Sequence, residues 1–154
     1  MSVSLYGSGN TVIQVVSSTL NTNFSSSSTS YITTGLTASI TPQSTTSKIL
    51  INYTFSGATT NSFQTQIYRN GSILSGASGT GTTYQASSLF IPQNSGSSGM
   101  YTVSSNYLDS PATTSSTTYA IYIKTDAGTF WFNTRSGSDF SGIATITLLE
   151  ISGS

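Results

Sequence analysis

The sequence predicts an all-β protein, an antiparallel sandwich or barrel of about ten short strands. Strong helix formers are sparse, and apolar residues nowhere recur at a helical period over three turns. Short runs rich in Thr, Val, Ile, Tyr and Phe follow one another at nearly regular spacing. Clusters of Gly, Asn, Ser and Pro separate these runs, as turns do in sandwiches and barrels.

The first predicted strands come from runs of β-branched residues. Residues 12–17 read VIQVVS, and residues 30–34 and 36–40 form two runs on either side of Gly35. Residues 48–56 read KILINYTFS and put an apolar residue at every second position. That alternation predicts a strand with one buried face.

The middle of the chain predicts a hairpin. Residues 63–69 read FQTQIYR and end at the dipeptide Asn70-Gly71. Both residues of such a dipeptide tolerate positive φ, so they suit a two-residue turn into a strand at 72–74. Residues 84–91 form the next predicted strand.

Four more strands are predicted in the last third of the chain. They span residues 100–108, 117–125, 129–133 and 143–151, each an aromatic or β-branched run bounded by turn residues.

The length of 154 residues fits one domain, which we expect at residues 12–154 after an N-terminal arm at 1–11. Two Gly/Ser-rich segments, 75–83 and 93–99, are predicted to be the longest loops. The Ser-rich run at 25–28 is also predicted to be a surface loop.

Composition excludes several functions. The chain has no Cys and no His. Zinc, haem and iron–sulfur sites therefore lack their usual ligands, and Ser–His or Cys–His catalytic pairs cannot form. Ser and Thr make up 60 of the 154 residues, and the formal net charge is zero. Only four cations are present, too few to neutralise a row of phosphates, so we expect no nucleic-acid partner. No apolar stretch approaches the roughly 20 residues of a spanning helix, so we expect no membrane partner.

The late strands carry apolar residues on both faces. In 143–151, Ile146 and Leu148 point to one side while Leu149 points to the other. In 117–125, Tyr122 lies out of phase with its apolar neighbours. A strand in a sheet with one solvent-exposed face should alternate apolar with polar residues. Cover by a loop of the same chain would explain the pattern, but we favour a neighbouring subunit, with Tyr122, Ile146 and Leu148 at the interface.

The four carboxylates are the remaining candidates for catalysis. Asp109, Asp126 and Asp139 occur in turn-like contexts, where Asp usually bonds its own backbone. Nothing in the sequence pairs any two carboxylates, as a glycosidase would require. The segments TDAGT and SGSDFSG could offer oxygens to calcium but lack the dense acidic spacing of a calcium loop. We therefore expect no enzyme activity and no cofactor, and the calcium question stays open.

Aromatic residues are candidates for binding a partner. Most rings should be in the core, because aromatic side chains dominate burial in small β domains. Trp131 alternates out of phase with Phe130 and Phe132, so an outward Trp131 could anchor an interface. We name Tyr6, Tyr101 and Trp131 as candidate partner-binding residues.

Several separated segments resemble a domain common in tailed bacteriophages. They are GNTVIQVVSSTL, GLTASITP followed by SKILI, YLDSPATTSSTTYAIYIK at residues 107–124, and the closing ITLLEIS. The resemblance covers roughly residues 9–152. Residues 63–100 show no strong marks of the family.

The resemblance implies a jelly roll of eight to ten strands, similar to the trimeric heads of the tumour-necrosis-factor superfamily. It also implies a homotrimer whose late strands pack near the threefold axis. Related domains occur in small virion proteins and in tail-fibre tips.

Two functions follow from that resemblance. The first is a homotrimeric capsid cement or decoration protein on the outer surface of the virion, bound to the major capsid protein or other virion proteins. The second is the receptor-binding tip of a tail fibre, with the loops at 75–83 and 93–99 contacting a host surface glycan or protein. We favour the first, because an arm of eleven residues leaves little reach from a tail.

Overall fold

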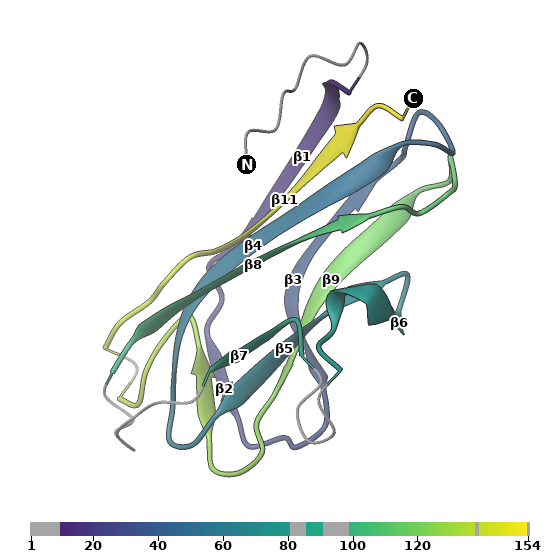
Figure 1. Cartoon of the computed structure of the whole chain (residues 1–154). Coiled ribbons are helices and arrows are strands. Elements are labelled where there is room, and N and C mark those ends of the chain that lie inside the picture. Colours follow the sequence, from purple (N-terminus) through teal and green to yellow (C-terminus); the bar gives the residue numbers. More distant parts are fainter. Residues whose placement is uncertain (1–9, 81–85, 91–98, 138, 154) are drawn as a thin grey trace, which may run out of the picture.

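Two antiparallel sheets pack face to face in the computed structural model, which describes residues 10–80, 86–90, 99–137 and 139–153 (Figure 1). The strands are, in chain order, β1 (Val12–Leu20), β2 (Phe24–Ser26), β3 (Ile32–Ile40), β4 (Lys48–Thr59), β5 (Phe63–Arg69), β6 (Ser72–Ile73), β7 (Ser88–Phe90), β8 (Tyr101–Asp109), β9 (Thr117–Lys124), β10 (Phe130–Phe132) and β11 (Ala144–Ile151). The helical content of these residues is one 3-10 turn, η1 (Ser75–Ala77). The all-β prediction is confirmed.

The two sheets have a jelly-roll-like strand order. Sheet A runs β1-β11-β4-β10-β2, with β8 also paired to β4. Sheet B runs β3-β9-β5-β6, with β7 also paired to β5. Figure 1 shows β1, β11, β4 and β8 side by side as one layer and β3, β9 and β5 as the other. Pairs such as β1 with β11 join opposite ends of the chain, as in folds built from Greek keys.

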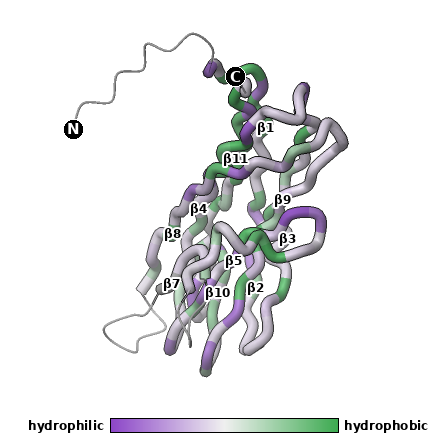
Figure 2. Tube along the Cα trace, turned by 45° about the vertical axis from the view of Figure 1, so that its right-hand side comes forward, coloured by the Kyte–Doolittle hydropathy of each residue, from purple (hydrophilic) through white to green (hydrophobic). Residues whose placement is uncertain are grey.

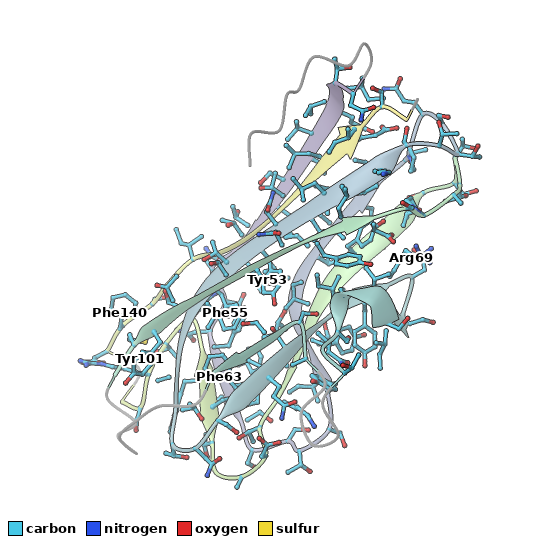
Figure 3. All side chains as sticks on the ribbon, viewed as in Figure 1. Tyr53, Phe55, Phe63, Arg69, Tyr101 and Phe140 are labelled. Atoms are coloured by element: carbon cyan, nitrogen blue, oxygen red, sulfur yellow. The ribbon has the colours of Figure 1, made fainter. Side chains whose placement is uncertain are left out.

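The core lies between the sheets and is rich in rings. Alternate residues of β4 point inward, and Tyr53 and Phe55 are almost fully buried. Phe55 stacks on Phe132 with ring centroids 4.8 Å apart and contacts Phe63 of sheet B at 5.8 Å. Figure 3 shows Tyr53, Phe55 and Phe63 between the layers. The apolar alternation of β4 thus positions the sandwich core, as the sequence predicts.

Strand β3 is longer than the sequence suggests. The predicted break at Gly35 is a bulge inside one continuous strand, with φ of +81° at Gly35 and a register shift between Thr33 and Thr37. A residue with positive φ can remain in a strand when it forms a bulge, so the glycine bends β3 without ending it.

The predicted surface loop at 25–28 is partly wrong. Phe24–Ser26 forms β2, which pairs with β10 along the edge of sheet A. Phe24 stacks on Phe132 with centroids 5.3 Å apart and meets Phe130 edge-on at 5.9 Å. These ring contacts come from residues more than a hundred positions away, so the Ser-rich run gives no local sign of them.

The predicted hairpin is confirmed. Asn70 and Gly71 have φ of 50° and 81°, and they join β5 to β6. The predicted strand at 84–91 is described only in part, as β7, and most of the predicted loop at 93–99 lies outside the described residues. Residues 1–9 of the predicted arm also lie outside them. Thr11 is tied to the other terminus, since the backbone N–H of Ser152 donates to its carbonyl at 2.9 Å.

Candidate functional site

The outer face of sheet A carries a row of apolar side chains across four adjacent strands. Val15 pairs with Leu149, Leu149 with Leu50, and Leu50 with Leu108. Directly opposite residues of antiparallel strands point to the same side of a sheet. Val15 is 58% exposed and Leu108 44%, while Leu50 and Leu149 are half-buried. We call these four residues the apolar row.

The apolar row lies toward the end of sheet A where β1 begins and β11 ends. Val12 and Ile13, also exposed, extend it along β1. Figure 2 shows hydrophobic segments of β1 and β11 near the C-terminus. Exposed apolar residues in one contiguous patch indicate a surface that another molecule covers.

A polar hollow lies next to the apolar row on the same face. It has a volume of about 300 Å³ and is lined by Asn52, Tyr53, Thr54, Ser104, Ser105, Asn106, Thr145 and Thr147. The hydroxyl groups of Ser17 and Thr147, one register step from the row, lie 3.1 Å apart. Among the outward side chains of β1, β11, β4 and β8, only Lys48 is charged. Apart from Lys48, which lies two positions from Leu50 on the same face of β4, these strands present only polar and apolar side chains outward.

Two of the residues predicted at a subunit interface are not available to a partner. Ile146 and Leu148 are 0% exposed in the single chain, because both point into the core between the sheets. The prediction chose the wrong face of β11. Its other face carries Thr145, Thr147, Leu149 and Ile151, all half-buried.

Tyr122, the third predicted interface residue, lies on the outer face of sheet B. Its ring stacks on that of Tyr68, with centroids 3.8 Å apart and planes 17° apart. Ile146 and Leu148 belong to sheet A and point inward, so the structure does not bring the three predicted residues together.

Two predicted partner-binding residues lie at the end of sheet A away from the apolar row. Trp131 is half-buried and stands between the buried rings of Phe130 and Phe132, so it points outward as the alternation predicts. Its register partner on β4 is Ala58, and Tyr101 pairs with the preceding residue, Gly57.

Exposed apolar side chains from the segment before β11 add to this end of the sheet. Phe140 is 47% exposed and Ile143 65%. Figure 3 shows Phe140 and Tyr101 at the same end of the molecule. We call Tyr101, Trp131, Phe140 and Ile143 the aromatic end. Tyr6, the remaining candidate, lies outside the described residues.

Asp109 links the two sheets. It ends β8 in sheet A and accepts hydrogen bonds from Arg69 Nη1 at 2.8 Å and from the Tyr119 hydroxyl at 2.6 Å, both from sheet B. Burial and the bond to Asp109 raise the pKa of Tyr119, and the hydrogen bond to Asp109 raises that of Arg69. The prediction that Asp109 bonds its own turn is wrong, because its partners lie on other strands.

The other carboxylates are also held by neighbouring groups. Asp126 accepts from Ser62 and Gln64 at 2.7 Å each, and Glu150, fully buried, accepts from the backbone N–H of Gln43 at 2.7 Å. Asp139 pairs with Arg135 on the surface, and the hydrogen bond from Arg135 lowers the pKa of Asp139.

These contacts do not gather acidic side chains into one site. In the described part of the chain, three or more metal-binding side chains come together nowhere. None of the helices described there is long and apolar enough to cross a membrane.

The sequence places Leu149 on a second apolar face of its strand, but it does not predict that Val15, Leu50 and Leu108 lie beside it. Leu50 lies out of phase with Ile49 and Ile51, as Leu149 does with Leu148. An apolar residue that breaks the alternation in each of two strands indicates an apolar patch on the outer face of their sheet. Their alignment depends on strand register, which the sequence does not display.

A comparison with known proteins adds no relative to these observations. No protein-family model and no curated protein matches the chain. Its function is therefore inferred from its own surfaces, among them the apolar row on sheet A.

Proposed function

We propose that the protein is a homotrimeric virion protein of a tailed bacteriophage, a cement or decoration protein of the outer capsid surface. The observation that carries this proposal is the apolar row, which crosses four strands with no cover from the described part of its own chain. The jelly-roll-like sandwich and the resemblance of the sequence to phage virion domains support it.

The outer face of sheet A is large enough to contribute to a stable interface. Four strands about 4.8 Å apart and eight residues long cover about 500 Å². A stable interface of standard size buries about 800 Å² per partner, so this face supplies a substantial part. Burying the apolar row between copies would stabilise the trimer through the hydrophobic effect.

The low charge of this face also suits a homotrimer. Near a threefold axis a side chain lies close to its own symmetry copies and a charged group is repelled by them. We therefore place Lys48, the one charged outward side chain of these four strands, at the rim of the interface and away from the axis. The polar hollow beside the apolar row offers amide and hydroxyl groups that can pair between copies directly or through water.

We assign binding of the capsid shell to surfaces other than the apolar row. The aromatic end, with Tyr101 and Trp131, belongs to sheet A but lies away from the apolar row, so it remains open when only the apolar row is covered. The arm at residues 1–11, with Tyr6, is the second candidate. We propose that these regions bind the major capsid protein, by aromatic contacts that need little charge.

Solution mass and position in the particle test the proposal. Light scattering should give three times the 16.1 kDa mass of one chain. Mass spectrometry of purified virions should find many copies per particle, and cryo-electron microscopy should place them on the capsid. A monomer in dilute buffer would overturn the trimer.

The alternative function is the receptor-binding tip of a tail fibre, which would use the same trimer. A few copies per particle, located on the tail, together with purified protein that blocks infection, would establish that function and exclude the capsid role.

A further inference from the structure

The outer face of sheet B presents an aromatic wall. Tyr68 of β5 stacks on Tyr122 of β9 at 3.8 Å, and both side chains are half-buried. On its other side Tyr68 pairs with Ile73 of β6, which is 49% exposed. Because Tyr122 covers the Tyr68 ring from the β9 side, the second face of that ring lies on the β6 side.

A hollow of about 250 Å³ lies on this side of the sheet. Its lining residues are Gln66, Ile73, Ser75, Ser78, Gly79 and Thr80. Gln66 lies two positions from Tyr68 on the same face of β5, and Ile73 is the register partner of Tyr68, so the hollow borders the aromatic wall. The lining offers an amide, three hydroxyl groups and one aliphatic side chain, and it carries no charge.

One hydroxyl of this lining lacks a partner. Ser78 Oγ is shielded from solvent and makes no hydrogen bond within the described part of the chain. The backbone N–H of Ser78 donates to the Ser75 carbonyl at 3.1 Å, which holds the residue at the end of η1. A buried hydroxyl without a partner costs free energy, so a turn about the Ser78 χ1 bond that brings Oγ to a ligand in the hollow would be favoured.

We propose that this hollow binds a neutral saccharide. A sugar ring has an apolar C–H face that fits against an aromatic ring and a rim of hydroxyl groups that pair with amides and hydroxyls. In this arrangement Tyr68, which borders the hollow, takes the apolar face, while the exposed hydroxyl groups of Ser75 and Thr80 take sugar hydroxyl groups. Gln66, 3% exposed, lies beneath them. The uncharged lining favours a neutral ligand over a phosphate or a carboxylate, and the volume suits one or two sugar rings.

The proposed saccharide site does not depend on the capsid role, and it names a ligand class for the alternative tail-fibre function, whose loop at 75–83 supplies Ser75, Ser78, Gly79 and Thr80 to the lining. It lies on the outer face of sheet B, whereas the apolar row lies on the outer face of sheet A. A trimer formed through sheet A therefore leaves the hollow open in each copy, so that three weak sites can act together on a glycan-coated surface.

Titration of the full chain with neutral trisaccharides tests the site. Maltotriose, mannotriose and triacetylchitotriose serve as probes in calorimetry and in saturation-transfer NMR, with sialyllactose as the charged comparison. We expect at least one neutral probe to bind with a Kd on the order of 1 mM, as a small open site allows, and sialyllactose to bind more weakly.

Two variants locate the binding. Tyr68→Ala removes the wall, and Ser75→Phe fills the hollow from an exposed position; each should weaken binding at least about tenfold. Thr102→Ala, a truncation of an exposed side chain on β8 of sheet A, should bind like the unmodified protein. Circular dichroism and thermal melting check the fold of each variant, and Ser75→Phe decides the matter if Tyr68→Ala is unfolded.

Two outcomes would overturn the site: no neutral probe binds, or both hollow variants bind as tightly as Thr102→Ala. The outcome is separate from that for the trimer. A monomer that binds sugar through Tyr68 contradicts the trimer alone, and a trimer that binds none of the probes contradicts the saccharide site alone.

Discussion

At the scale of single residues, Asp109 shows how a chain with few charges uses them inside the fold. It is 5% exposed and joins Arg69 and Tyr119 across the two sheets. A buried carboxylate is tolerated when cationic and hydroxyl donors satisfy it. The sequence places Asp109 before a Ser-Pro turn, but the contacts that explain it come from sheet B.

Asp109→Asn tests this polar link. The substitution keeps the size of the side chain but removes its charge, so Arg69 loses its ion pair and Tyr119 loses its strongest acceptor. We expect the free energy of unfolding to fall by about 1–3 kcal/mol, the lower part of the range reflecting the partial exposure of Arg69. Urea unfolding measures this change.

Asp139→Asn is the matched control, because it removes the partner of Arg135 at the surface. It should leave the urea midpoint unchanged within error. Equal effects of the two substitutions would mean that the Asp109 contacts contribute no more than a solvated pair does.

At the scale of elements, β11 contributes one face to the core and the other to the proposed interface between copies. It lies between β1 and β4 in sheet A, and its residues alternate between the core and the outer face. Leu148 and Leu149 are chemically identical neighbours with opposite roles. Antiparallel register aligns Leu149 with Val15 and Leu50, which creates the apolar row.

Aspartate substitutions at Leu148 and Leu149 separate these roles. Leu149→Asp should leave a folded chain but reduce the mass in light scattering from trimer to monomer, because the charge lies at the proposed interface. Leu148→Asp should unfold the protein, since it buries an unpaired charge between the sheets.

Circular dichroism and light scattering on the same samples distinguish these results. If Leu149→Asp stayed trimeric, the apolar row would not be the surface through which copies associate. A folded Leu148→Asp variant would contradict the placement of that residue in the core.

At the scale of the whole molecule, the absence of His and the buried tyrosine hydroxyl groups determine how stability changes between neutral and alkaline pH. The chain has no His, so no side chain with an ordinary pKa near neutrality changes charge there. Burial raises the pKa of Tyr31, Tyr53 and Tyr119 above the usual value of 10.0. Their protonated forms are therefore favoured in the folded state.

Alkaline unfolding follows from these tyrosines. In the unfolded chain they ionise near pH 10, while in the folded chain they stay protonated to higher pH. The free energy of unfolding should therefore change little between about pH 6 and 9 and fall as pH rises above about 10. Urea unfolding at a series of pH values, with tyrosinate absorbance on the same samples, measures both.

Tyr119→Phe provides the control for this profile. It removes one of the raised groups, so the fall in stability above pH 10 should be shallower, although the variant loses the hydrogen bond to Asp109 at every pH. Stability that stayed constant to about pH 11 would contradict the burial of these hydroxyl groups.

The sequence by itself determined the all-β class, most strand positions and the Asn70-Gly71 hairpin. These features depend on local alternation and turn chemistry, which are visible in a few consecutive residues. Tertiary structure decided which face of β11 is buried, that Phe24–Ser26 forms a strand, and that Val15, Leu50, Leu108 and Leu149 share a row. The physical reason is that strand pairing joins residues far apart in the sequence, such as Val12 and Ile151, which the local pattern cannot reveal. Alternation also does not indicate which side of a strand faces the other sheet.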